Sequence, residues 1–396
     1  MKRIISWLAA IALILGLVMV STGCTARTAM RHPWVFVHGL NGFGEDDRLP
    51  LQYWGATGGN LLEALRYEGF EVYAPTVSPA GSAWSRAAEL FAQLTGTQVD
   101  YGIAHSEAHG TERFGVAHDT PLFEGWGQYD ENGSLRRVNL LGHSFGGNTI
   151  RMLAALLQDG CANEQAAARE AGEEVSPLFA GGKSDWVFSI TTIASPHNGV
   201  SLLSLFDINP TMVAIAEALP QAQIDQTMQA LGINIPGITN LAQFLRAAES
   251  QNTAFADLTL NGAQLVNQRT GLAPATFYFS FPVSGTDANG RPDANDMSIP
   301  SRLLATQIAL FTHPASGITS IWRENDGLVN TISATRPFTE AHVDVATLEG
   351  LRPEPGIWHV MPTVRGDHGS VVGLGRNLTD LLPMYLEHMQ MVDGLR

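Results

Sequence analysis

The 396-residue sequence is poor in cysteine and in basic residues, and both shortages exclude classes of protein. The two cysteines, Cys24 and Cys161, are too few for a disulfide framework. Lysine and arginine number 23 against 38 aspartates and glutamates, which gives a formal charge of −15. Nucleic-acid binding requires a basic stripe, and the sequence shows none, so we expect no nucleic-acid partner.

An apolar run from Ile4 to Val20 lies at the N-terminus, directly after two basic residues. A basic start, an apolar run and small residues before a cleavage point are typical of a signal peptide. Gly23-Cys24 further resembles a bacterial lipobox, although a serine stands three positions before the cysteine where leucine is usual. We expect residues 1–23 to be a lipoprotein signal peptide and Cys24 to be lipidated. The chain would then be exported and tethered to the outer membrane or cell surface; simple secretion and an uncleaved anchor are the alternatives.

Strand and helix patterns alternate along the rest of the chain, which is 45% hydrophobic overall. Strands are expected at 33–37, 70–74, 138–141, 186–193, 276–281 and, as the last one, 357–362; helices at 60–69, 84–94 and 148–157. This alternation favours an α/β fold with a mostly parallel sheet and helices on both faces. Because no linker is evident, we expect a single domain over residues 32–396.

A glycine-rich turn joins one of these strands to the helix that follows it. Its residues, Gly142-His143-Ser144-Phe145-Gly146, form a G-x-S-x-G motif in strand–turn–helix context. Glycines permit the sharp turn that lifts a serine hydroxyl off the sheet. Ser144 is therefore a candidate nucleophile, and a purely structural bend is the alternative, since a serine also needs a base, an acid and an oxyanion hole.

The base should come late in the chain, because in the α/β-hydrolase layout the order is nucleophile, acid, histidine. The late histidines are His342, His359, His368 and His388. His342 lies in a polar stretch, His359 in an apolar strand and His388 in the C-terminal helix. His368 lies in a glycine-containing loop after the last expected strand, and it is our candidate base.

The orienting acid should lie between nucleophile and base, where the segment WRENDGLVN offers Glu324 and Asp326. The Asp-Gly turn favours Asp326, whose carboxylate would hold the imidazole in the correct tautomer. Two backbone N–H groups should form the oxyanion hole. We expect them from Phe145, directly after the nucleophile, and from Leu40, in the loop after the first strand.

Several blocks of sequence together resemble the thermostable bacillar and staphylococcal triacylglycerol lipases of the α/β-hydrolase superfamily. They are VHGLNGFG, QYWG, VDYGIAH, RFG, GHSFGGNTIRML, SPLFAGG, TTIASPHNG, WRENDGLVNT and DH, in that order. The resemblance implies an α/β-hydrolase fold. It also implies that Ser144, Asp326 and His368 form the catalytic triad and that Leu40 and Phe145 supply the oxyanion hole.

The chain departs from that family at the metal sites. The positions that match the family's zinc ligands hold Ser85, His105, Thr111 and Asn252, and those that match its calcium carboxylates hold Ser370 and Gly375. Of these, only His105 is a good ligand, and a zinc site needs about four. We therefore expect no metal cofactor; the alternative is a replacement site at His105 and His109 with Glu107 and Glu112.

Residues 201–270 match the family's lid, and their apolar segments are either packed core helices or a mobile cover over the site. We expect a helical lid. The leading function is a serine ester hydrolase, a triacylglycerol lipase acting at a lipid–water interface. The alternatives are a carboxylesterase or polyesterase on short-chain or polymeric esters, and a non-catalytic lipid-binding surface lipoprotein, which the intact triad argues against.

Overall fold

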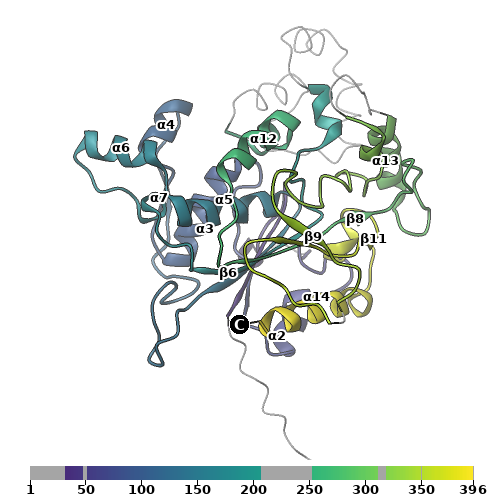
Figure 1. Cartoon of the computed structure of the whole chain (residues 1–396), viewed down its shortest axis with the longest axis horizontal. Coiled ribbons are helices and arrows are strands. Elements are labelled where there is room, and N and C mark those ends of the chain that lie inside the picture. The colour runs from purple at the N-terminus through teal and green to yellow at the C-terminus, as the bar shows by residue number, and fades with distance from the viewer. Residues whose placement is uncertain (1–31, 48–50, 207–251, 311–317, 349, 396) are drawn as a thin grey trace, which may run out of the picture. The chain divides into compact units, whose positions relative to one another are not determined.

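A computed structural model describes residues 32–47, 51–206, 252–310, 318–348 and 350–395 (Figure 1). From His32 onward the chain forms one compact unit. The expected signal peptide, Cys24 and the centre of the expected lid, residues 207–251, lie outside the described residues.

Seven strands of the described chain form one sheet, and each neighbouring pair in it is parallel. In spatial order they are β2 (Val72–Tyr73), β1 (Trp34–Val37), β5 (Val138–His143), β6 (Val187–Ile193), β7 (Phe277–Phe281), β10 (Trp358–Val360) and β9 (His342–Asp344). The expected mostly parallel sheet is confirmed. The edge strand β9, in the polar stretch that holds His342, was not expected, because its residues are exposed and so lack a buried-strand pattern.

The described residues also form two small two-stranded sheets. In one, β3 (Gln98–Asp100) is antiparallel to β4 (Phe114–Ala117); in the other, β8 (Val283–Ser284) is parallel to β11 (Val364–Arg365). Strand β11 comes after β10, so the prediction that the segment at 357–362 holds the last strand is wrong. A two-residue strand carries too little alternation to be recognised from sequence.

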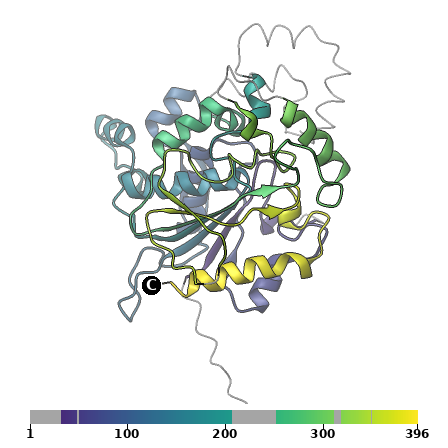
Figure 2. The ribbon, with the colours of Figure 1, turned by 45° about the vertical axis from the view of Figure 1, so that its right-hand side comes forward.

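Helices cover both faces of the large sheet, as expected (Figure 2). Along β1, Val35 and Val37 pack into the core shared with α3 (Ala83–Thr95) and α5 (Phe145–Asp159). Trp34 and Phe36 point the other way, and their rings contact those of His388 and Tyr385 in α14 (Leu378–Asp393). Helix α2 (Leu61–Tyr67) packs beside α14. Successive side chains of a strand point to opposite faces, so one apolar strand packs against the helices on both faces of the sheet.

The remaining labelled helices lie in the upper half of the view in Figure 1, away from α2 and α14. The α-helices are α4 (Ile103–His109), α6 (Ala162–Ala171), α7 (Pro177–Ala180), α11 (Ala254–Leu258), α12 (Leu260–Arg269) and α13 (Ile299–Leu310). The 3₁₀ turns are η1 (Glu45–Asp47), η2 (Ser201–Phe206), η4 (Ser320–Trp322) and η5 (Ser370–Val372). Among the helices that the structure describes, none has the length and apolar character needed to cross a membrane.

Candidate active site

Ser144 occupies a strained turn between β5 and α5. Its backbone has φ 55° and ψ −131°, a conformation that a residue with a side chain rarely adopts. The flanking glycines permit this turn: a Cβ on Gly146 would lie 2.1 Å from the carbonyl oxygen of Val37, and one on Gly142 would lie 2.4 Å from the carbonyl carbon of Gly146. The turn therefore requires glycine on both sides of the serine.

The structure brings Ser144, His368 and Asp326 into one hydrogen-bonded chain. The Ser144 hydroxyl donates to His368 Nε2 at 2.8 Å, and His368 Nδ1–H donates to Asp326 Oδ2 at 2.7 Å. Asp326 is fully buried, and its Oδ1 accepts the backbone N–H groups of Leu328 and Val329 at 2.9 and 2.7 Å. Asp326, and not Glu324, is thus the carboxylate bonded to His368. This is the arrangement that an activated serine nucleophile needs.

The other late histidines lie in other parts of the fold. His359 is buried in β10, with its Nδ1 bonded to the carbonyl oxygen of Tyr278 at 3.1 Å. His388 is buried in α14 against the sheet, and His342 lies in the exposed strand β9. Strand β10 and the helix α14 agree with the elements expected for His359 and His388.

The N–H groups of Leu40 and Phe145 flank the serine. The loop after β1 runs against Ser144, because a Cβ on Gly39 would lie 2.7 Å from Ser144 Cβ. In that loop, the Gly39 and Asn41 N–H groups donate to other residues. Within the described chain, the N–H groups of Leu40 and Phe145 have no hydrogen-bond partner. Phe145 is the first residue of α5, whose opening N–H groups have no acceptor within the helix.

A buried arginine and a buried histidine orient the loop that carries Leu40. The Arg86 guanidinium donates to the carbonyl oxygens of His38 and Gly39 and lies over the Phe145 ring, with its central carbon 5.1 Å from the ring centroid. His38 Nδ1–H also donates to the Gly39 oxygen at 2.8 Å. Burial, and then the Arg86 charge, lowers the pKa of His38 to about 3, so that ring is neutral. Because C=O and N–H of a trans peptide point in opposite directions, these bonds set the direction of the Leu40 N–H.

Two further residues lie beside the site, Tyr53 and His143, and their roles there are not predicted from the sequence. The Tyr53 hydroxyl lies 2.6 Å from His143 Nδ1, and His143 Nε2 lies 3.0 Å from the carbonyl oxygen of His368. Tyr53 belongs to the QYWG block and His143 to the G-x-S-x-G motif. No spacing rule connects two residues that lie 90 positions apart, so no sequence pattern predicts the contact.

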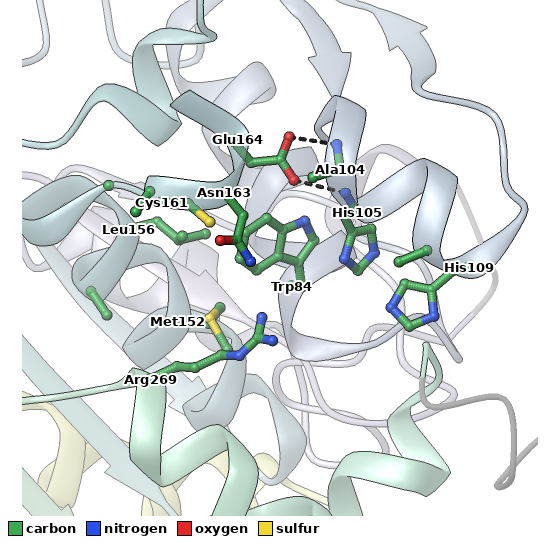
Figure 3. A pocket seen from close by; sticks show the side chains of 14 residues that line it. Trp84, Ala104, His105, His109, Met152, Leu156, Cys161, Asn163, Glu164 and Arg269 are labelled. Carbon is green, nitrogen blue, oxygen red and sulfur yellow. Dashed lines mark hydrogen bonds between the residues drawn. The ribbon is translucent and has the colours of Figure 1, made fainter. Parts of the chain in front are cut away.

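His105, one of the positions that match the family's zinc ligands, lines a pocket of about 410 Å³ together with His109 and Glu164 (Figure 3). Ser85 and His105 both donate to the side-chain oxygen of Asn252, each at 3.1 Å. Glu164 accepts the backbone N–H groups of His105 and Ala104, so its carboxylate is already occupied. In the part of the chain that the structure describes, no three His, Cys, Asp or Glu side chains gather closely enough to hold a metal ion. The expected absence of a metal cofactor stays a prediction.

Comparison with known proteins agrees with this geometry. A family model for the lipase-like C-terminal domain matches residues 30–395. A lipase of Staphylococcus hyicus is 36% identical over 358 residues, which cover 87% of this chain and 54% of that protein. Lipase 2 of Staphylococcus aureus is 34% identical over 363 residues, which cover 87% of this chain and 50% of that protein. The chain thus spans about half the length of the curated relatives it matches.

Solved structures match over most of their length. The crystal structure of Staphylococcus hyicus lipase has 32% identity and a TM-score of 0.71 and covers 91% of this chain and 96% of that one. Lipase 1 from Pelosinus fermentans has 29% identity and a TM-score of 0.69, with 92% and 99% covered. Both the resemblance to staphylococcal lipases and the expected α/β-hydrolase architecture are confirmed. The chain therefore belongs to the lipase-like family of α/β-hydrolases that includes the staphylococcal lipases.

Proposed function

We propose that this chain is a serine ester hydrolase that cleaves acylglycerols, which makes it a triacylglycerol lipase. One observation carries the proposal: Ser144 lies on a strained turn, is hydrogen-bonded through His368 to Asp326, and has beside it two N–H donors with no acceptor among the described residues. Relatives named lipases, matched over most of this chain, support the substrate class. Since those relatives are about twice as long, the activity of the whole protein belongs to the proposal.

The reaction follows from the positions of the atoms. Ser144 Oγ attacks the ester carbonyl carbon while His368 Nε2 takes the hydroxyl proton, and Asp326 stabilises the resulting imidazolium. The Leu40 and Phe145 N–H groups stabilise the negative charge that develops on the carbonyl oxygen. The carbon–oxygen bond to the alcohol then breaks, and His368 returns the proton to the leaving diacylglycerol oxygen. Water, deprotonated by His368, attacks the acyl-enzyme and releases the fatty acid and the free serine.

The setting of the reaction is also part of the proposal. We infer that the substrate is met at a lipid–water interface and that residues 201–270 act as a lid, as the family resemblance implies. We also infer that the chain is exported and tethered to a membrane through a lipid on Cys24, with the Gly23-Cys24 step as the supporting observation.

The test compares the wild type with Ser144→Ala on emulsified triolein and on p-nitrophenyl esters of increasing acyl length. Wild type should hydrolyse triolein, and the variant should lose roughly 10⁴-fold of kcat or more while keeping its circular dichroism spectrum. A variant that retains a tenth of the wild-type rate would refute the nucleophile. A wild type active only on short soluble esters would instead be a carboxylesterase.

A further inference from the structure

A continuous path of hydrogen bonds joins the loop after β1 to the backbone of His368. The Gly39 N–H donates to the Tyr53 oxygen at 2.8 Å. The Tyr53 oxygen lies 2.6 Å from His143 Nδ1, and His143 Nε2 lies 3.0 Å from the His368 carbonyl oxygen. The middle of the path adjoins Ser144, because His143 directly precedes the serine in the chain.

The direction of every bond in this path is determined by its two ends. A backbone N–H can only donate and a carbonyl oxygen can only accept. His143 must therefore carry its proton on Nε2 and accept on Nδ1, and Tyr53 must donate its one proton to His143. Desolvation raises the pKa of Tyr53 to about 12, and burial lowers that of His143 well below 6.5. Near neutral pH the phenol thus keeps its proton and the imidazole does not gain a second one.

The two ends of the path belong to the two halves of the proposed machinery. Gly39 immediately precedes Leu40, whose N–H is a proposed oxyanion donor, and the other end is the backbone of the proposed base. The His143 and His368 rings also lie close together, with their centroids 4.8 Å apart. A displacement of about 1 Å in such a constellation can cost roughly 100-fold in rate.

We propose that Tyr53 and His143 are positioning residues. They hold the loop that carries Leu40 and the catalytic histidine, His368, in fixed positions relative to each other and to Ser144. This role rests on the proposed function, since it assigns Leu40 and His368 their parts in the reaction. In this role each residue acts through the residues to which it is bonded and not through a contact with the substrate.

The first experiment removes one oxygen atom. Tyr53→Phe keeps the ring but leaves the Gly39 N–H and His143 Nδ1 without their partner. On a soluble p-nitrophenyl ester, kcat should fall about 10-fold to 100-fold while KM stays within about twofold, because substrate binding is untouched.

Tyr278→Phe is the matched control. The buried Tyr278 oxygen also accepts a backbone N–H, that of Ala273 at 2.8 Å, but it lies in β7 and outside the path. This variant should lose some thermal stability and keep its kcat within about twofold. An equal loss of kcat in both variants, or none in Tyr53→Phe, would overturn the positioning role.

The second experiment divides the path at His143. In His143→Asn the side-chain oxygen can still accept from Tyr53, but the donor to His368 is lost. In His143→Gln the side-chain nitrogen can still donate to the His368 carbonyl oxygen, but the acceptor for Tyr53 is lost. We expect the downfield NMR signal of the His368 Nδ1 proton to keep its wild-type position in the Gln variant and to shift in the Asn variant. A wild-type signal in both variants would refute the path.

These results separate the two proposals. A wild type that hydrolyses no ester would refute the proposed function itself. An active wild type with an unimpaired Tyr53→Phe variant would overturn the positioning role alone.

Discussion

Replacing Asp326 with asparagine exchanges one oxygen for a nitrogen, and the surrounding hydrogen bonds determine where that nitrogen must lie. Oδ1 accepts two backbone N–H groups, from Leu328 at 2.9 Å and Val329 at 2.7 Å. Among the described residues, Oδ2 accepts only the His368 Nδ1 proton, at 2.7 Å. An asparagine must keep its oxygen toward the two backbone donors, so its amide nitrogen faces His368.

An amide nitrogen can only donate a hydrogen bond, and this forces His368 into the opposite tautomer. His368 must then accept at Nδ1 and carry its proton on Nε2, which meets the Ser144 hydroxyl with a proton instead of a lone pair. It can no longer take the serine proton. We expect kcat to fall about 10⁴-fold, which corresponds to about 5.5 kcal/mol of activation free energy.

The assay measures kcat and KM of Asp326→Asn and of Glu324→Gln on a soluble p-nitrophenyl ester, with melting temperatures as a check on folding. Glu324→Gln should retain kcat within about twofold, because the carboxylate bonded to His368 belongs to Asp326. If Asp326→Asn kept a tenth of the wild-type kcat while Glu324→Gln lost it, the reasoning would be refuted and the acid would be Glu324.

Three further predictions concern metal, lipid and pH. EDTA should leave the melting temperature and activity unchanged. A metal that binds only the folded state would add about 4 kcal/mol to the free energy of unfolding at a thousandfold excess over Kd. Purified protein with near one equivalent of zinc or calcium, and a melting temperature that EDTA lowers, would contradict this prediction. Labelled palmitate should mark the wild type and not Cys24→Ser, which should leave the membrane; a mass spectrum showing an unmodified N-terminus elsewhere would exclude lipidation. Burial lowers the pKa of His388 from its ordinary value of 6.5 to about 3. On acidification the unfolded chain therefore binds a proton first, and the free energy of unfolding falls from about pH 6.5 toward pH 3. The melting temperature of His388→Phe should therefore fall less steeply over that window, and an unchanged slope would show that His388 is not responsible.

The parts of the fold that the sequence predicted are those whose signal is local. Strand β5, the turn at Ser144 and helix α5 lie in one continuous stretch, in which apolar spacing and two glycines determine the geometry. The loop positions of Asp326 and His368 followed from chain order and the Asp-Gly turn. Their mutual distances did not, because these depend on the register of the whole sheet.

The parts that the sequence missed depend on contacts between distant segments. Strand β9 is exposed at a sheet edge, where no buried face enforces an alternating pattern. The bond between Tyr53 and His143 joins residues whose types are common in many other roles. Only the packed sheet brings them together, since it places the loop after β1 beside the end of β5.

The hydrogen bond between Ser144 and His368 joins residues 224 positions apart, one in the turn after β5 and the other in the loop after β11. We expect a contact of such long range to form late in folding, because closing the intervening chain costs entropy before the contact can stabilise the fold. During refolding, helical signal should thus return before esterase activity does. Recovered activity would then report that the C-terminal segment carrying His368 has docked against the turn at Ser144.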